Sequence, residues 1–207
     1  MKEESLKKFI YLSLAAALVT IALKFSAFFI TGSMGFFSDA LESFVNLFAA
    51  IIALIMLNLS AKPADKEHEY GHSKAEYFSS AIEGALIVLA AFSILWSAVP
   101  RLFEPKPLTN IGRGLLFSVA ALLVNLAVSL VLIHTGKRKH SLVLEADGKH
   151  LMTDVWTSVG VFAGILVVRF TGIYIFDPII AIAVAINIIY TGYQLISRSA
   201  SGLMDAS

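Results

Sequence analysis

The chain has 207 residues, of which 57% are hydrophobic, 15% are charged and none is cysteine. Soluble domains average about 45 to 50% apolar and about 25% charged residues, so this composition excludes an ordinary water-soluble domain. The formal net charge of +1 gives no polybasic excess, which excludes a nucleic-acid binder held by charge. The lack of cysteine excludes disulfides, thiolate metal sites and cysteine nucleophiles.

Six apolar runs are long enough to cross a bilayer as helices, which takes about 20 residues each. They are predicted near residues 9–31, 35–59, 77–100, 115–134, 151–171 and 178–196. Each is too long and too continuous for a barrel strand, and the first is too long for a cleavable signal peptide. The predicted fold is an all-α membrane protein, a six-helix bundle in one transmembrane domain over residues 1–207, with no C-terminal cytosolic domain.

The basic residues indicate which way the helices cross the membrane. The amino end, the second-to-third and fourth-to-fifth connections and the tail carry eleven Lys and Arg, whereas the opposite side carries four. Because cytoplasmic connections are enriched in Lys and Arg, both termini are predicted to be cytoplasmic. We expect a multi-pass protein of the cell (inner) membrane.

Several polar and ionisable residues lie inside these apolar runs. A charge at the bilayer centre costs roughly 2.5 to 3.5 kcal/mol on insertion scales, so such groups face a protein interior or water and have partners. They are Lys24 in the first run, Asp39, Glu42 and Asn46 in the second, Glu83 in the third, and His150 and Asp154 at the start of the fifth.

The spacing of four of them predicts a metal site. Glu42 and Asn46 lie four residues apart on one helix face, and His150 and Asp154 repeat that spacing. If the two faces meet, two carboxylates, an amide and an imidazole surround one point, which suits a tetrahedral divalent cation such as zinc. Imidazole favours zinc, iron, cobalt or nickel over magnesium or calcium, and the lack of sulfur disfavours copper(I).

Other interpretations of these residues stay open. Asn46 could bond across helices without touching a metal. Asp39 could contribute to the site or cap the start of the second helix. For Lys24 and Glu83 we expect a structural ion pair between the first and third helices.

Four segments together resemble the cation diffusion facilitator family. They are Gly32–Met34, Ser38–Ser43, the connection 63–76, and His150 to Asp154 in the fifth run. The likeness covers essentially the whole chain. It implies a six-helix transporter that works as a homodimer and exports zinc or a related divalent metal in exchange for protons.

The resemblance also implies which residues form the transport site. The family's positions fall on Glu42, Asn46, His150 and Asp154, where the usual second-helix residues are Asp or His followed by Asp. Because Asn46 replaces a carboxylate by a weaker neutral donor, iron(II), manganese and cobalt stay open beside zinc. Asp39 is a possible source of the missing charge, but it lies about 10 Å along the helix from Asn46.

Two further features follow from the resemblance. Asp65, His68 and His72 match a second metal site that some members carry in the second-to-third connection; the alternative is a solvated loop that binds nothing tightly. Lys74 and Asp205 match a structural ion pair between the third and sixth helices.

Family members commonly continue into a cytosolic metal-sensing domain, whereas this chain ends at Ser207. It is therefore either a short member or cut from a longer protein, and its dimer would rest on transmembrane contacts. Two rival classes remain. One is a metal-binding or assembly subunit that transports nothing. The other, an intramembrane metalloenzyme, is disfavoured because no HExxH or nucleophile motif is present, so we predict that the chain is not an enzyme.

Overall fold

The computed structural model describes residues 2–60, 75–139 and 142–204. Within these ranges the chain forms helices and no strand, which confirms the all-helical prediction. The helices are α1 (Lys2–Thr31), α2 (Met34–Ser60), α3 (Ala75–Ala98), α4 (Pro100–Phe103), α5 (Ile111–Lys139), α6 (Leu142–Thr171) and α7 (Phe176–Met204).

The six long helices follow the six apolar runs, but some extend beyond them. α6 begins at Leu142, nine residues before the predicted run, so His150 lies more than two turns inside the helix. α5 continues to Lys139, and its last turn contains basic residues. Their positive charges interact favourably with the negative end of the helix dipole. The short α4 was not predicted; Pro100 stands at its start, where a residue without an N–H is tolerated.

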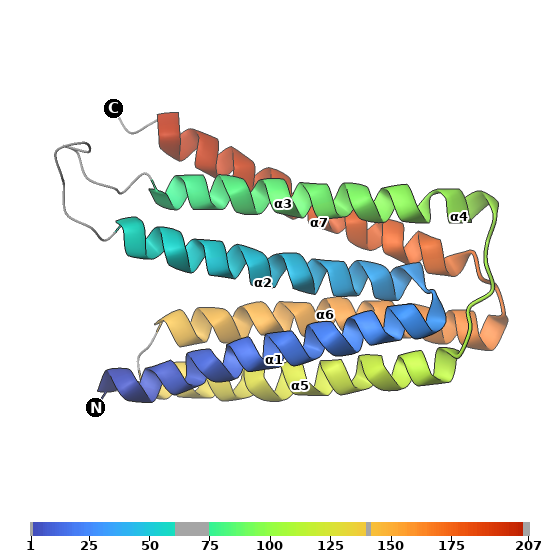
Figure 1. The fold of residues 1–207 in the computed structure, drawn as a ribbon, viewed down its shortest axis with the longest axis horizontal. Coiled ribbons are helices and arrows are strands. Elements are labelled where there is room, and N and C mark those ends of the chain that lie inside the picture. The colour runs from blue at the N-terminus through green and yellow to red at the C-terminus, as the bar shows by residue number, and fades with distance from the viewer. Residues whose placement is uncertain (1, 61–74, 140–141, 205–207) are drawn as a thin grey trace.

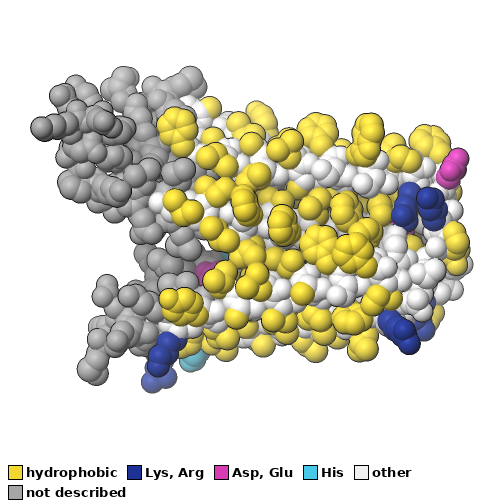
Figure 2. All heavy atoms as spheres, viewed as in Figure 1, with side chains coloured by type: hydrophobic (Ala, Val, Ile, Leu, Met, Phe, Trp, Pro, Cys, Tyr) yellow, Lys and Arg dark blue, Asp and Glu magenta, His cyan; other side chains and the backbone are white. Residues whose placement is uncertain are grey.

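Five helices, α1, α3, α5, α6 and α7, are long and apolar enough to span a membrane. α2 is of similar length but is not among these five helices in the described part of the chain. Figure 2 shows hydrophobic side chains along the length of the bundle and Lys and Arg near its two ends. Large apolar side chains such as Trp96 and Phe170 are more than 80% exposed, so the bundle is built to contact a lipid bilayer.

The long helices form two groups (Figure 1). α5 packs along α6 and α1 packs on α5, whereas α3 packs along α7 and α2 packs on α3. An apolar core around Ile94 and Ala185 joins α2, α3 and α7. A second core around Leu115 and Ile165 joins α1, α2, α5 and α6. α2 therefore contributes buried residues to both cores.

α1 begins and α7 ends at the same end of the molecule, which we call the terminal end (Figure 1). The two groups of helices diverge toward this end and converge at the opposite one, the far end. The connections from α1 to α2 and from α6 to α7 both lie at the far end.

A buried carboxylate ties the far end together. Asp177, at the start of α7, accepts hydrogen bonds from the backbone N–H groups of Met34 (2.8 Å) and Gly35 (3.0 Å) and from the Ser33 hydroxyl. Ser33 in turn caps α2, because its Oγ accepts from the N–H of Phe36 at 3.1 Å. A carboxylate at a helix N-terminus is stabilised by the free N–H groups and the helix dipole, so α7 is held to the start of α2.

The end of α1 is tied in a similar way. Gly32 has a φ of +69°, the left-handed conformation that ends a helix and suits glycine. Its carbonyl accepts a 2.7 Å bond from the guanidinium of Arg101. The hydroxyl of Thr109 donates to the carbonyl of Ile30 at 2.9 Å. The connection between α3 and α5 is therefore fixed to the end of α1.

Candidate cation site

A lysine lies almost fully buried among α1, α2 and α6. The Nζ of Lys24 donates to Asp39 Oδ1 at 2.9 Å, to Asp154 Oδ2 at 2.8 Å and to Ser43 Oγ at 2.7 Å. Lys24 is only 2% exposed. An ammonium has three protons to donate, and these three contacts use them all.

The two carboxylates that hold the ammonium have further partners. Asp154 accepts a bond from the Ser43 hydroxyl at 2.9 Å and another from the side-chain amide of Asn125 on α5. Asp39 accepts from the Ser158 hydroxyl at 2.9 Å. We call these five residues, together with Lys24, the lysine cluster. Its formal charge is −1, and buried ions are tolerated only when they are paired and hydrogen-bonded in this manner.

The prediction of an ion pair between Lys24 and Glu83 is wrong. The Lys24 ammonium donates its three hydrogen bonds to Asp39, Asp154 and Ser43 instead. Asp39 is not the cap of α2 either, since Ser33 fills that place. Periodicity shows which residues share a helix face, but it does not show which neighbouring helix that face meets.

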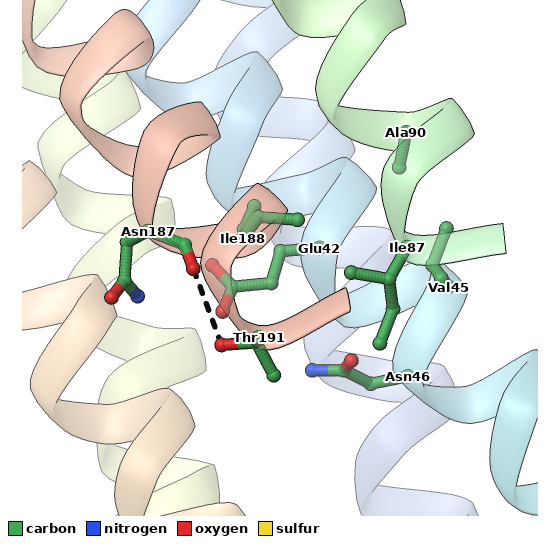
Figure 3. Close-up of a pocket in the computed structure, with 8 residues that line it drawn as sticks. All are labelled: Glu42, Val45, Asn46, Ile87, Ala90, Asn187, Ile188 and Thr191. Carbon is green, nitrogen blue, oxygen red and sulfur yellow. Dashed lines mark hydrogen bonds between the residues drawn. The ribbon is translucent and has the colours of Figure 1, made fainter. Parts of the chain in front are cut away.

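α2 presents two different polar faces to its two neighbours. Asp39 and Ser43, four residues apart, face the lysine cluster. Glu42 and Asn46, also four apart, line a cavity between α2, α3 and α7 (Figure 3). The two faces lie side by side on one helix, so α2 separates the cavity from the cluster.

The cavity has a volume of about 40 Å³, whereas a single water molecule needs roughly 10 to 15 Å³. Ile87 and Ala90 of α3 and Ile188 of α7 form much of its wall. Its polar groups come from Glu42 and Asn46, with Asn187 and Thr191 on α7. The cavity is therefore mostly apolar with a few polar groups, which is the usual character of a binding site.

Glu42 is the unusual member of this cavity. Its Oε2 atom is buried and has no hydrogen-bond partner among the described residues. In Figure 3 the carboxylate reaches from α2 toward α7, with Thr191 and Asn46 beside it. The Thr191 hydroxyl donates to the Asn187 carbonyl at 3.2 Å. A buried carboxylate without a partner is costly, so this oxygen is suited to receive a cation.

The four predicted ligands do not form one cluster in this structure. Asp154 belongs to the lysine cluster, Glu42 and Asn46 line the cavity, and His150 is exposed on α6. Within residues 2–60, 75–139 and 142–204, no group of three or more His, Cys, Asp or Glu side chains is placed to hold a metal ion. The remaining predicted site residues, Asp65, His68, His72, Lys74 and Asp205, lie outside the described residues.

Sequence reasoning missed several polar residues that belong to the lysine cluster or line the cavity, Asn187 among them. Ser43 and Ser158 each follow an intramembrane Asp by four residues, and that spacing could have identified them. Asn125 is a lone amide within an apolar run, a signal of a buried contact between helices. For Thr191 the sequence holds no such signal.

Among the described residues, Glu145 lies before the membrane-spanning part of α6 and has a shifted pKa. Glu145, in the first turn of α6, accepts a 2.8 Å bond from Lys149, and this contact lowers the pKa of the carboxyl. A lowered pKa stabilises the folded state above the ordinary pKa of Glu, and that stabilisation is lost as pH falls through the lowered value. Lys149 is 66% exposed, so solvent screens the pair.

Comparison with known proteins places the chain in a family. The family model described as the cation efflux transmembrane domain matches residues 10–204. An uncharacterized transporter from Synechocystis is 51% identical over 95% of this chain and 63% of its own length. The cation-efflux pump FieF of Shewanella oneidensis is 31% identical over 93% of the chain and 65% of its length.

A third relative is the cadmium, cobalt and zinc/H(+)-K(+) antiporter of Bacillus subtilis, which is 28% identical over 86% of the chain and 57% of its own length. The chain thus spans less than two thirds of each of these relatives. The family and its named members are transporters, not enzymes. The resemblance seen in the sequence is confirmed: the chain belongs to the cation efflux family and carries its transmembrane domain.

Proposed function

We propose that this chain carries a divalent metal cation, with zinc as the first candidate, out of the cytoplasm in exchange for protons. Iron(II), manganese and cobalt are the alternatives. The Bacillus subtilis relative is named a cadmium, cobalt and zinc/H(+)-K(+) antiporter, which supports zinc or cobalt as the metal and protons as a counter-ion. Metal ligands must be deprotonated to bind, so metal and protons compete for the same side chains.

The observation that carries the proposal is the buried carboxylate of Glu42, whose Oε2 has no partner in the described part of the chain. It lies in a cavity between α2, α3 and α7, the three helices of one group. An unpaired carboxylate oxygen in a small, mostly apolar cavity favours the binding of a cation that has lost its hydration water.

We infer that α2 is the sixth membrane span, with both termini cytoplasmic in the cell membrane. Two observations support this inference. Both ends of the described chain lie at one end of the bundle. Lys and Arg are concentrated in the amino end, the tail and the connections predicted to lie on the same side of the membrane. The terminal end then faces the cytoplasm, and the cavity is filled from there. We further propose that two copies form a homodimer in the membrane.

The proposed transport site combines Glu42 and Asn46 with Asp154 and His150, and Asp39 adds charge nearby. To join them, α6 must move its Asp154 away from the lysine cluster and toward the cavity. Such movement around a central site is how transporters alternate access. The ties at the far end, above all Asp177 on the start of α2, then have to open for release.

A second metal site at Asp65, His68 and His72, and the ion pair between Lys74 and Asp205, are proposals from the resemblance. Metal added to a variant with both histidines replaced by alanine tests the first. Unchanged binding stoichiometry in that variant would count against a loop site.

The experiment is metal uptake by sealed proteoliposomes, measured for zinc, iron(II), manganese and cobalt together with the pH inside. We expect uptake of at least one metal with opposite proton movement, and loss of both in Asp154→Ala and His150→Ala. Retained uptake in either variant contradicts the site. Binding without uptake in the unaltered protein points instead to the non-transporting subunit, for which the neutral Asn46 would be the first residue to explain.

A further inference from the structure

We propose that Lys24 is a built-in competitor of the transported metal: its ammonium occupies Asp154 in the metal-free protein, and the metal displaces it. This inference rests on the proposed function and extends it, because it assigns a specificity role to a residue of α1 outside the proposed ligand set. Lys24 does not bind the metal in this proposal but acts through Asp154, to which it donates a hydrogen bond.

The first step is that Asp154 has no oxygen free for a metal in this structure. Its Oδ2 accepts from Lys24 at 2.8 Å and from Asn125, and its Oδ1 accepts from Ser43 at 2.9 Å. The residue is 6% exposed. A metal that approaches this buried carboxylate therefore competes with these donors, and the ammonium is the only one of them that carries a charge.

The second step is that Lys24 has a place to stay when Asp154 leaves. The same ammonium donates to Asp39 at 2.9 Å and to Ser43 at 2.7 Å, both on α2. Asp39 is 1% exposed and is also held by Ser158. A buried ion that loses its only partner is strongly destabilising, whereas Lys24 keeps a carboxylate and a hydroxyl. The cluster is therefore built so that Asp154 can be exchanged.

The third step concerns selectivity. A divalent ion that replaces a single ammonium charge at Asp154 gains Coulomb energy, because the attraction scales with the product of the charges. A monovalent ion such as potassium gains nothing by the same exchange. Divalent cations can then displace the Lys24 ammonium from Asp154, whereas monovalent cations cannot.

The test is the zinc dissociation constant of the purified protein in detergent, measured by calorimetry for three forms. Lys24→Met combined with Asp39→Asn removes the ammonium but keeps the cluster charge at −1, so long-range charge is matched to the unaltered protein. We expect at least tenfold tighter zinc binding in this double variant. Asp39→Asn alone leaves Asp154 as the carboxylate that pairs with Lys24 in the lysine cluster, and we expect at least threefold weaker zinc binding.

The matched control is Lys106→Met, because Lys106 is an exposed lysine in the connection between α4 and α5 and removes one positive charge far from the cluster. It should bind zinc as the unaltered protein does. An affinity of the double variant within threefold of the unaltered protein would overturn the proposal while leaving the proposed function intact. Absence of zinc binding and uptake in the unaltered protein would instead reject the proposed function itself.

If the double variant does not fold, the zinc affinity of Asp39→Asn alone still tests the proposal. Asp39→Asn retains the ion pair of Lys24 with Asp154, so equal or tighter zinc binding by this variant contradicts a competing lysine. A potassium titration of the double variant adds an independent readout. We expect potassium to reduce its apparent zinc affinity and to leave that of the unaltered protein unchanged.

Discussion

Two neighbouring residues of α2, Glu42 and Ser43, point to different parts of the molecule and have different partners. Ser43 bonds to Lys24 and Asp154 in a cluster where each buried charge is paired. Glu42 faces a cavity with one carboxylate oxygen unpaired. The charged groups of the lysine cluster are therefore hydrogen-bonded without a metal, whereas the Glu42 carboxylate has an oxygen that lacks a partner among the described residues.

The first prediction is that Glu42→Gln weakens zinc binding at least tenfold while the melting temperature stays the same or rises. The amide keeps the size of the side chain but removes a buried charge whose Oε2 has no hydrogen-bond partner among the described residues. Calorimetry gives the affinity, and thermal unfolding in detergent gives the stability. Ser93→Ala, on the exposed side of α3, is the control. Unchanged affinity would remove Glu42 from the site.

The second prediction concerns Asn46, which lines the same cavity. Asn46→Asp adds a carboxylate beside Glu42, so we expect tighter binding of zinc and a changed order of preference among zinc, manganese and iron(II). The repulsion between the two carboxylates should lower the melting temperature of the metal-free protein. An unchanged metal profile in competition assays would mean that Asn46 serves only packing.

At the scale of elements, glycines allow α5 and α6 to approach closely. A Cβ added at Gly148 would lie 2.9 Å from the backbone nitrogen of Ile133 and 2.8 Å from its Cγ1, which is closer than packed atoms tolerate. A Cβ added at Gly160 of the same helix would meet nothing within 4 Å. One helix thus offers a test position and its control.

The third prediction follows from this difference. Gly148→Ala forces α5 and α6 apart, and overpacking of this kind costs about 1 to 3 kcal/mol. Gly160→Ala should leave stability unchanged or raise it by up to ~1 kcal/mol through better helix propensity. Chemical unfolding in detergent measures both. Equal stability of the two variants would mean that α5 and α6 do not pack as described.

The helices themselves could be predicted from sequence because each apolar run is long and uninterrupted. Their ends could not, because charged residues interrupt the apolar pattern in the first two turns of α6, which begins at Leu142, and in the last turn of α5, which ends at Lys139. The partner of Lys24 was mispredicted for a related reason. Which helix faces α1 depends on packing of the whole bundle, and that places Asp154 beside Lys24, although 130 residues separate them in sequence.

The cavity residues divide in the same way. Glu42 stood out because an intramembrane carboxylate is rare and functional by default. Thr191 did not, because a single hydroxyl in an apolar helix usually bonds to its own backbone, and here it does donate to Asn187. Only the packing of α7 against α2 and α3 brings Thr191 beside Glu42.

At the scale of the whole molecule, the far end is tied by polar contacts and the helix groups diverge toward the terminal end (Figure 1). The cavity at Glu42 lies between α2, α3 and α7. We expect metal ions to pass through this cavity and to enter it from the terminal end, where both termini lie. Since the chain has no cysteine, an introduced thiol is unique and can be used to block the path.

The most direct measurement is zinc uptake by proteoliposomes of Thr191→Cys before and after an impermeant thiol reagent is added on the side of the termini. Thr191 lines the cavity but is not a proposed ligand, so this variant should transport zinc until it is labelled, and labelling should reduce uptake at least tenfold. The unaltered protein and Ser93→Cys, exposed on α3, should keep full uptake after the same treatment. Full uptake by completely labelled Thr191→Cys would show that the metal takes another path and would contradict the account.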